Sequence, residues 1–130
     1  MGFKFMHNAG GQTPMTRFYP ATGAATLKDA AVALNTGKLV LAQADTNVAC
    51  IGVAQASPVA ADELVEVVIA SPDAVFRVGK SGTATPAIGG KYEGSADGMT
   101  INADGVTNPK WKVIGTSDGE YLVMNISFGL

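Results

Sequence analysis

The sequence predicts an all-β fold, a compact β-barrel or β-sandwich that carries an extended N-terminal arm. Short runs of apolar residues alternate with polar residues at a period of two, and turn dipeptides separate these runs at intervals of roughly 8–12 residues. The composition agrees: 130 residues that are 47% hydrophobic can enclose one core, and 15% charged residues are too few for a coiled coil or a disordered chain.

Residues 1–22 are predicted to form the arm, and residues 23–130 the body of the barrel. The first segment is rich in large apolar side chains, but the sequence Asn-Ala-Gly-Gly-Gln-Thr-Pro at 8–14 interrupts any regular pattern. Ordering about 20 residues costs more free energy than burying their few large side chains returns. We therefore expect the arm to become ordered only against a neighbouring chain.

Charge is distributed unevenly along the chain. Residues 1–28 carry +3, and residues 29–130 carry −5, which leaves a net charge of −2. The basic start predicts docking on an acidic surface, while the acidic whole argues against nucleic acid as a partner. The arm residues expected to contact a neighbouring subunit are Phe3, Lys4, Phe5, Met6, Arg17, Phe18 and Tyr19.

The first part of the body has two interpretations. Leu27, Ala30, Ala31 and Leu34 follow the helical spacing i, i+3, i+4, i+7, and the residues before them resemble a capping box. The alternative is a hairpin in which a strand over 30–34 turns at 35–37 into a strand over 38–41. Strand-like sequence begins directly after the turn, which favours the hairpin.

Further strands are predicted at 38–42, 48–54, 64–69, 73–78, 99–102, 110–114 and 121–128. The last has the most regular alternation, and its even-numbered side chains, from Leu122 to Phe128, are expected to face the core. Asp-Gly dipeptides at 97–98, 104–105 and 118–119 predict turns, and residues 81–90 predict a loop at the rim of the barrel.

Groups that carry chemistry are few, so we predict no catalytic, cofactor-binding or metal-binding residues and no enzymatic activity. Cys50, the single cysteine, lies in an apolar run and is expected to be buried and inert. His7, the single histidine, lies in the arm without partners for a triad or a zinc site. Gly79-Lys80-Ser81 lacks the earlier glycine of a phosphate-binding loop, because position 74 is alanine.

Three other features have structural and functional interpretations. Acidic residues at 62–66 and oxygen-bearing residues at 97–104 could supply carboxylates, but their spacing favours solvated loops and turns. Trp111 lies between two lysines and could act as a stacking platform for a base or a sugar. A single tryptophan at the start of a strand is more typical of a core residue or an interface anchor.

Targeting signals are absent from the sequence as given. The first residues lack the apolar region of a signal peptide, and no apolar run approaches the roughly 20 residues of a membrane helix. We expect a protein that is made in the cytoplasm and used there or in a particle assembled there, with no membrane partner.

Several segments resemble one family in outline. They are the sequences DAAVAL at 29–34, GKLVLA at 37–42, IGVA at 51–54, VEVVI at 65–69, AVFRV at 74–78 and the C-terminal strands from 113 to 128. This outline resembles the small β-barrel proteins that decorate the heads of tailed bacteriophages, of the capsid-cement type. The segment 81–98 and the phenylalanine-rich arm are not features of that resemblance.

The resemblance implies a structural virion protein that binds the outer surface of a phage capsid and stabilises it by bridging coat subunits. The implied partners are the major capsid protein and further copies of the chain, as a homotrimer, and no cofactor is implied. Two alternatives stay open. One is a soluble β-barrel module that binds a ligand or glycan through Trp111 and the 81–98 loop. The other is a component of a phage tail tube or fibre.

Overall fold

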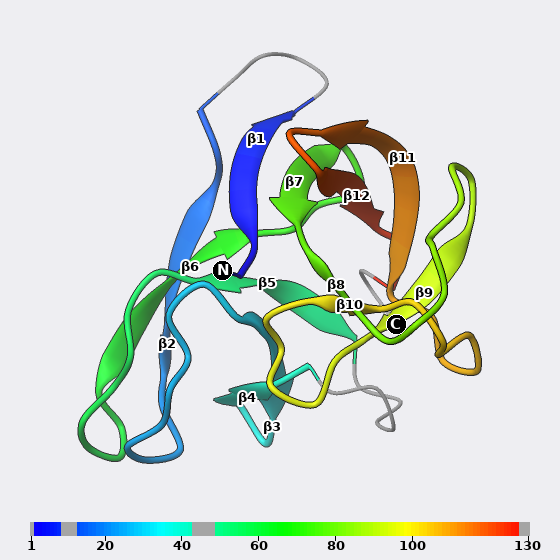
Figure 1. Cartoon of the computed structure of the whole chain (residues 1–130). Helices are drawn as coiled ribbons and strands as arrows, with labels where there is room; N and C mark the ends of the chain where they lie inside the picture. Colours follow the sequence, from blue (N-terminus) through cyan, green and yellow to red (C-terminus); the bar gives the residue numbers. More distant parts are fainter. Residues whose placement is uncertain (1, 9–12, 43–48, 128–130) are drawn as a thin grey trace.

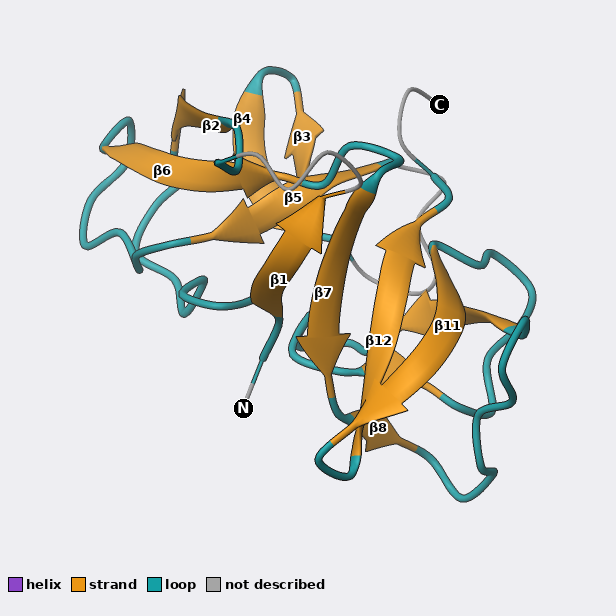
Figure 2. Ribbon diagram, turned by 90° about the horizontal axis from the view of Figure 1, so that it is seen from above, coloured by secondary structure: helices purple, strands orange, loops and turns teal. Residues whose placement is uncertain are grey.

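The computed structural model describes residues 2–8, 13–42 and 49–127, and it is all-β, as predicted: two packed sheets and no helix in these ranges (Figures 1 and 2). The strands are β1 (Lys4–Asn8), β2 (Thr16–Pro20), β3 (Ala31–Asn35), β4 (Lys38–Leu41), β5 (Cys50–Ala54), β6 (Leu64–Ile69), β7 (Ala74–Val78), β8 (Lys80–Ser81), β9 (Lys91–Gly94), β10 (Ile101–Asn102), β11 (Trp111–Ser117) and β12 (Glu120–Asn125).

The first sheet has seven strands in the order β1-β7-β12-β11-β9-β10-β8. Only Gly79 separates β7 from β8, yet β7 pairs with β12 and β8 pairs with β10. One continuous segment, β7 to β8, therefore pairs near one end of the strand order and at the other end. This connection curls the sheet around the side chains on its inner face.

The second sheet has five strands in the order β2-β6-β5-β3-β4, and it also curls. Its two end strands are linked by one isolated parallel bridge between Ala21 and Leu39. The Thr22 hydroxyl donates a hydrogen bond of 2.9 Å to the Leu39 carbonyl beside this bridge. The concave side of the sheet thereby encloses apolar side chains of its own.

The ambiguous segment forms the hairpin rather than the helix. β3 and β4 pair from Asn35↔Lys38 outward, and Thr36 and Gly37 between them have φ values of 51° and 82°. Two consecutive positive φ angles define the tight turn whose twist matches a hairpin. The same turn joins β11 to β12 at Asp118 and Gly119, with φ values of 51° and 79°, as the Asp-Gly dipeptide predicts.

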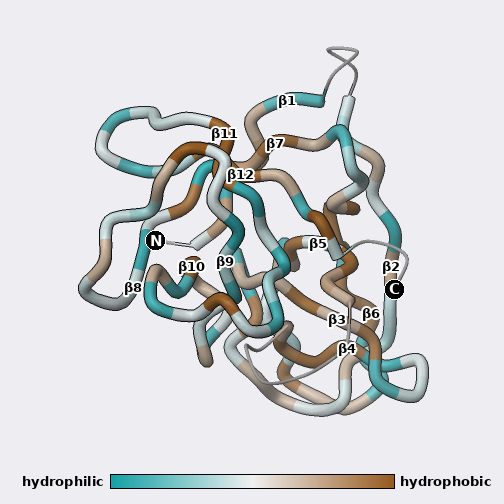
Figure 3. The backbone as a smooth tube through the Cα atoms, turned by 90° about the vertical axis from the view of Figure 1, so that its right-hand side faces the viewer, coloured by the Kyte–Doolittle hydropathy of each residue, from teal (hydrophilic) through white to brown (hydrophobic). Residues whose placement is uncertain are grey.

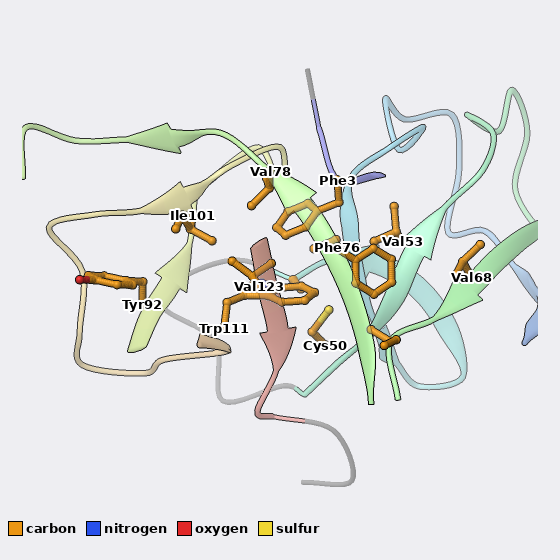
Figure 4. Close-up of a cluster of buried hydrophobic side chains, with 14 of the residues drawn as sticks. Phe3, Cys50, Val53, Val68, Phe76, Val78, Tyr92, Ile101, Trp111 and Val123 are labelled. Atoms are coloured by element: carbon orange, nitrogen blue, oxygen red, sulfur yellow. The ribbon is translucent and has the colours of Figure 1, made fainter. Parts of the chain in front are cut away.

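Two hydrophobic cores hold the fold together. The larger core lies between the sheets around Trp111, whose ring contacts those of Phe3 and Phe76 (Figure 4). The smaller core fills the concave side of the second sheet around Val32 and Val65. Because β3, β5 and β6 bury both faces, they are almost continuously apolar, as the hydropathy colours of Figure 3 illustrate.

The expectation that residues 1–22 lie outside the body, as an arm ordered only by a neighbouring chain, is wrong for the described residues. β1 pairs with β7 and β2 pairs with β6, so each forms an edge of one sheet of the same chain. Phe3 is buried and stacks on Trp111 with ring centroids 4.6 Å apart. The hydrogen bonds and contacts that offset the cost of ordering these residues come from two sheet edges of the same chain rather than from a neighbouring chain.

The expected orientation of the last strand is also wrong. Val123 and Asn125 of β12, with Ser127 beyond it, are buried, whereas Leu122 and Met124 are partly exposed on the opposite side. The next section gives the physical reason, which is a buried polar network. Phe128 lies outside the described residues.

Candidate interaction surfaces

The most exposed apolar surface outside the loops lies where β2 pairs with β6. Met15, Phe18 and Leu64 are each more than half exposed. Phe18 lies opposite Glu66, and Pro20 opposite Leu64, so the side chains of these four residues share one face of the second sheet. At this end the second sheet extends beyond the first, which leaves the face uncovered (Figure 1). We call the surface formed by Phe18 and Leu64 the β2–β6 flank. Met15 lies opposite Ile69, on the other face of the sheet.

The backbone edge beside this flank is unpaired among the residues that the structure describes. The Ile69 amide donates to the Met15 carbonyl at 2.9 Å, and the Ala21 amide donates to the Glu63 carbonyl at 2.8 Å. Odd-numbered residues of β2 therefore bond to β6, and in an antiparallel ladder the even-numbered residues point their N–H and C=O groups away. Pro20 is one of these even-numbered residues, so its lack of an N–H group removes no hydrogen bond between β2 and β6. Thr16 and Phe18 thus present free backbone groups.

Charge at this end of the molecule is mixed. Arg17 is exposed and makes no ion pair with the described residues. Asp62 is paired with Lys38 at 2.8 Å, and the Glu63 carboxylate accepts a hydrogen bond of 3.1 Å from the Val59 amide. Two of the acidic residues at 62–66 therefore form local contacts, an ion pair and a hydrogen bond, in agreement with the structural interpretation of this cluster.

The residues that the sequence predicts as subunit contacts lie in different places in the structure, some in the core and some on the surface. Phe3 lies in the core, so it is not a surface contact in this fold, and Phe5 packs edge-on against Phe76 at 5.7 Å. Lys4 and Met6 are exposed on the edge of the first sheet.

The other predicted contacts belong to the second sheet. Arg17 and Phe18 are exposed on β2, while Tyr19 is half-buried against the smaller core. The contacts predicted on β1 and β2 therefore belong to two different sheets rather than to one arm.

Trp111 is completely buried, so it is neither an exposed platform nor an interface anchor. It packs between Phe3 and Phe76 in the core. Two lysines flank it in sequence, but the strand alternation turns its side chain inward while Lys112 points outward. Its interpretation as a core residue is confirmed.

Cys50 is buried, and Asp97 and Asp104 are engaged in local hydrogen bonds. Burial raises the pKa of the Cys50 thiol to about 12, which confirms a buried and unreactive cysteine. Hydrogen bonds from the Ser95 hydroxyl and the Met99 amide lower the pKa of Asp97. Amides of the 82–90 loop lower that of Asp104 in the same way. Both aspartates therefore stabilise turns, as expected.

A buried polar network joins the two sheets. The Asn125 amide donates to the carbonyls of Cys50 and Ala70 at 2.7 and 3.0 Å, and its carbonyl accepts from the amide and hydroxyl of Ser127. The Ser127 hydroxyl in turn accepts from the Cys50 amide at 3.1 Å. These bonds satisfy the unpaired backbone groups where the two sheets meet, which turns Asn125 inward and the apolar Met124 outward.

One surface was missed by the sequence reasoning: the outer face of the first sheet, where Ile114, Leu122, Met124 and Ile126 are partly exposed. The only signal for it was the regular apolar alternation of the last strand, which we assigned to the core. No group of His, Cys, Asp or Glu in the described ranges could hold a metal ion.

Comparison with family models, with curated proteins and with solved structures found no match to this chain. Within the described ranges, no helix has the length and apolar character needed to cross a membrane.

Proposed function

We propose that this protein is a structural virion protein that binds the outer surface of a tailed-phage capsid and stabilises it by bridging coat subunits. The observation that carries the proposal is the β2–β6 flank: exposed apolar side chains beside an unpaired strand edge, on a small two-sheet body. An exposed apolar patch of this kind is typical of a surface that binds another protein.

The chemistry of the described residues supports a structural role over a catalytic one. The thiol is buried, the acidic turns are engaged in local hydrogen bonds, and the exposed groups of the flank are aliphatic and aromatic. The exposed side chains of Phe18 and Leu64 fit an apolar patch on a coat surface. Assembly as a homotrimer would multiply these contacts on one particle.

The ligand-binding alternative has lost its main support, because the stacking platform it needs is Trp111, which is buried. The tail alternative also predicts a β-rich, oligomeric protein, and it places that protein elsewhere on the particle. It is therefore an outcome of the localisation experiment described at the end of the Discussion.

Charge substitution on the flank tests the proposal. Phe18→Asp places a carboxylate in the exposed apolar surface without touching either core, so thermal stability is expected to stay within a few degrees of wild type. Occupancy on purified particles is expected to fall at least tenfold. The matched control is Ile88→Asp, at a still more exposed apolar residue in the 82–90 loop, which should bind normally. Unchanged occupancy of Phe18→Asp would remove the flank from the proposal.

A further inference from the structure

The outer face of the first sheet carries an unusual row of side chains. Strand register places Lys91 opposite Lys112, Lys112 opposite Met124, Met124 opposite Val75, and Val75 opposite His7. Residues directly opposite one another point to the same side of a sheet, so these five side chains form one line across β9, β11, β12, β7 and β1.

A shallow groove of about 330 Å³ meets this row at Lys112 and Met124. It is lined by Pro72, Lys112, Ile114, Met124, Asn125 and Ile126. The isoleucines are each 38% exposed, so aliphatic side chains form much of the lining and one ammonium group stands beside them. Such a groove fits an aliphatic side chain that is followed by an anion.

The two lysines at the end of the row do not serve the stability of the sheet. Like charges placed directly opposite on adjacent strands destabilise a pair. Both side chains are exposed, and neither pairs with an acidic group among the described residues. On the same sheet the Arg77 guanidinium is already paired, with Asp118 at 3.4 Å and Glu120 at 3.1 Å. The ammonium groups of Lys91 and Lys112 are thus available to bind an acidic group of another molecule.

We propose that this face is a second docking surface, for an extended acidic and apolar segment of a neighbouring protein, with a carboxylate between Lys91 and Lys112 and an aliphatic side chain in the groove. Within the proposed function this partner is a coat subunit, and a second surface is what bridging two subunits requires. A nucleic acid fits less well, because the groove has aliphatic rather than aromatic lining and the whole chain is acidic.

The charge reversal Lys112→Glu separates a binding role from a structural one. It places a carboxylate opposite Lys91, which turns a repulsive cross-strand pair into an attractive one. The melting temperature is therefore expected to rise slightly or to stay unchanged, while occupancy on particles falls. The double variant Lys91→Glu/Lys112→Glu should lower particle affinity about tenfold. Lys80→Glu, at an exposed lysine that does not line the groove, is the matched control and should bind as wild type does.

A peptide probe tests the chemistry of the partner without a particle. The probe is a blocked hexapeptide of alternating isoleucine and aspartate, and its control carries asparagine in place of aspartate. Methyl NMR on the full chain should show saturable shifts at Ile114, Met124 and Ile126, with a Kd of about 1 mM or tighter. The signal of Ile101, in the core, should stay in place. The asparagine peptide, and the acidic peptide added to Lys112→Glu, should bind about tenfold more weakly.

Four outcomes would overturn this inference. They are equal binding of the two peptides, the absence of shifts on the outer face, preferential binding of a DNA oligonucleotide there, and concentration-dependent dimerisation abolished by Lys112→Glu. The last would assign the face to a second copy of the chain. Loss of particle binding in Phe18→Asp together with normal binding in Lys112→Glu would leave the proposed function standing and remove only the second surface.

Discussion

Removal of the Asn125 side chain is expected to be the most damaging single change in the molecule. Its amide donates to the carbonyls of Cys50 and Ala70, and its oxygen accepts two hydrogen bonds from Ser127. Asn125 is only 2% exposed, so water does not readily replace these partners. The variant Asn125→Ala would leave two carbonyls and one amide buried without hydrogen bonds.

The magnitude follows from the number of bonds. Four hydrogen bonds at about 1 kcal/mol net each give a loss of about 4 kcal/mol. The total stability of a domain is about 5–15 kcal/mol, so this is a large part of it. With an unfolding entropy of about 2.1 cal/mol/K per residue, the loss corresponds to a decrease of about 15 °C in the melting temperature of a 130-residue chain.

Thermal and urea denaturation measure this loss, and two further variants interpret it. Asn125→Leu keeps the number and branching of the side-chain heavy atoms but not the hydrogen bonds, so it should be destabilised about as much as Asn125→Ala. Asn35→Ala, at an exposed asparagine beside a turn, should stay within about 2 °C of wild type. A decrease of less than about 4 °C for both Asn125 variants would refute the idea that this network joins the sheets.

Three other predictions concern stability and reactivity. Cys50, with its pKa raised to about 12, should resist alkylation at pH 8 in the native protein and react fully in guanidinium; rapid native labelling would contradict its burial. Gly52→Ala should destabilise the fold by about 1–3 kcal/mol in urea titrations, because an added Cβ would meet the backbone of β6, while Gly23→Ala, which meets nothing within 4 Å, should be neutral. Asp97 should titrate below its ordinary pKa of 3.8 in carbon-detected NMR, and Ser95→Ala should move the pKa back toward that value. Because folding lowers this pKa, its contribution to stability is present above the unfolded pKa and is lost as the pH falls through the folded value.

Local signals in the sequence predicted the strands and the tight turns. Alternation over 64–69 and 73–78 identified β6 and β7, and the Asp-Gly dipeptide at 118–119 identified the hairpin between β11 and β12. The hairpin forms over 30–41 in spite of the helical spacing at 27–34. The turn at Gly37 and the strand-forming sequence directly after it favour the hairpin, and both signals lie within a few residues of the segment. Structural features that depend on residues close together in the sequence could therefore be predicted from it.

Structural features that depend on contacts between residues far apart in the sequence could not be predicted from it. Asn125 is the polar member of an otherwise apolar alternation, so hydropathy alone turned it outward, yet it is buried because two carbonyls from the other sheet need a donor. Phe3 was assigned to a surface because its stacking partner, Trp111, lies more than a hundred residues along the chain.

The candidate surfaces show the same division. Arg17 and Phe18 were predicted as contacts from charge and apolar character, and the structure leaves both exposed. The facing pair of Lys91 and Lys112 depends on the register between β9 and β11, which no local pattern specifies. Their separate positions in the sequence carry no sign that the two ammonium groups are neighbours.

The position of the protein in a purified particle tests the proposed function most directly. Electron cryomicroscopy of whole particles, compared with particles stripped of this protein, would locate it without any assumption about contacts. We expect density for the two-sheet body on the outer surface of the capsid, between coat subunits, with the β2–β6 flank against the shell. Density confined to the tail, or particles that never contain the protein, would contradict the proposal.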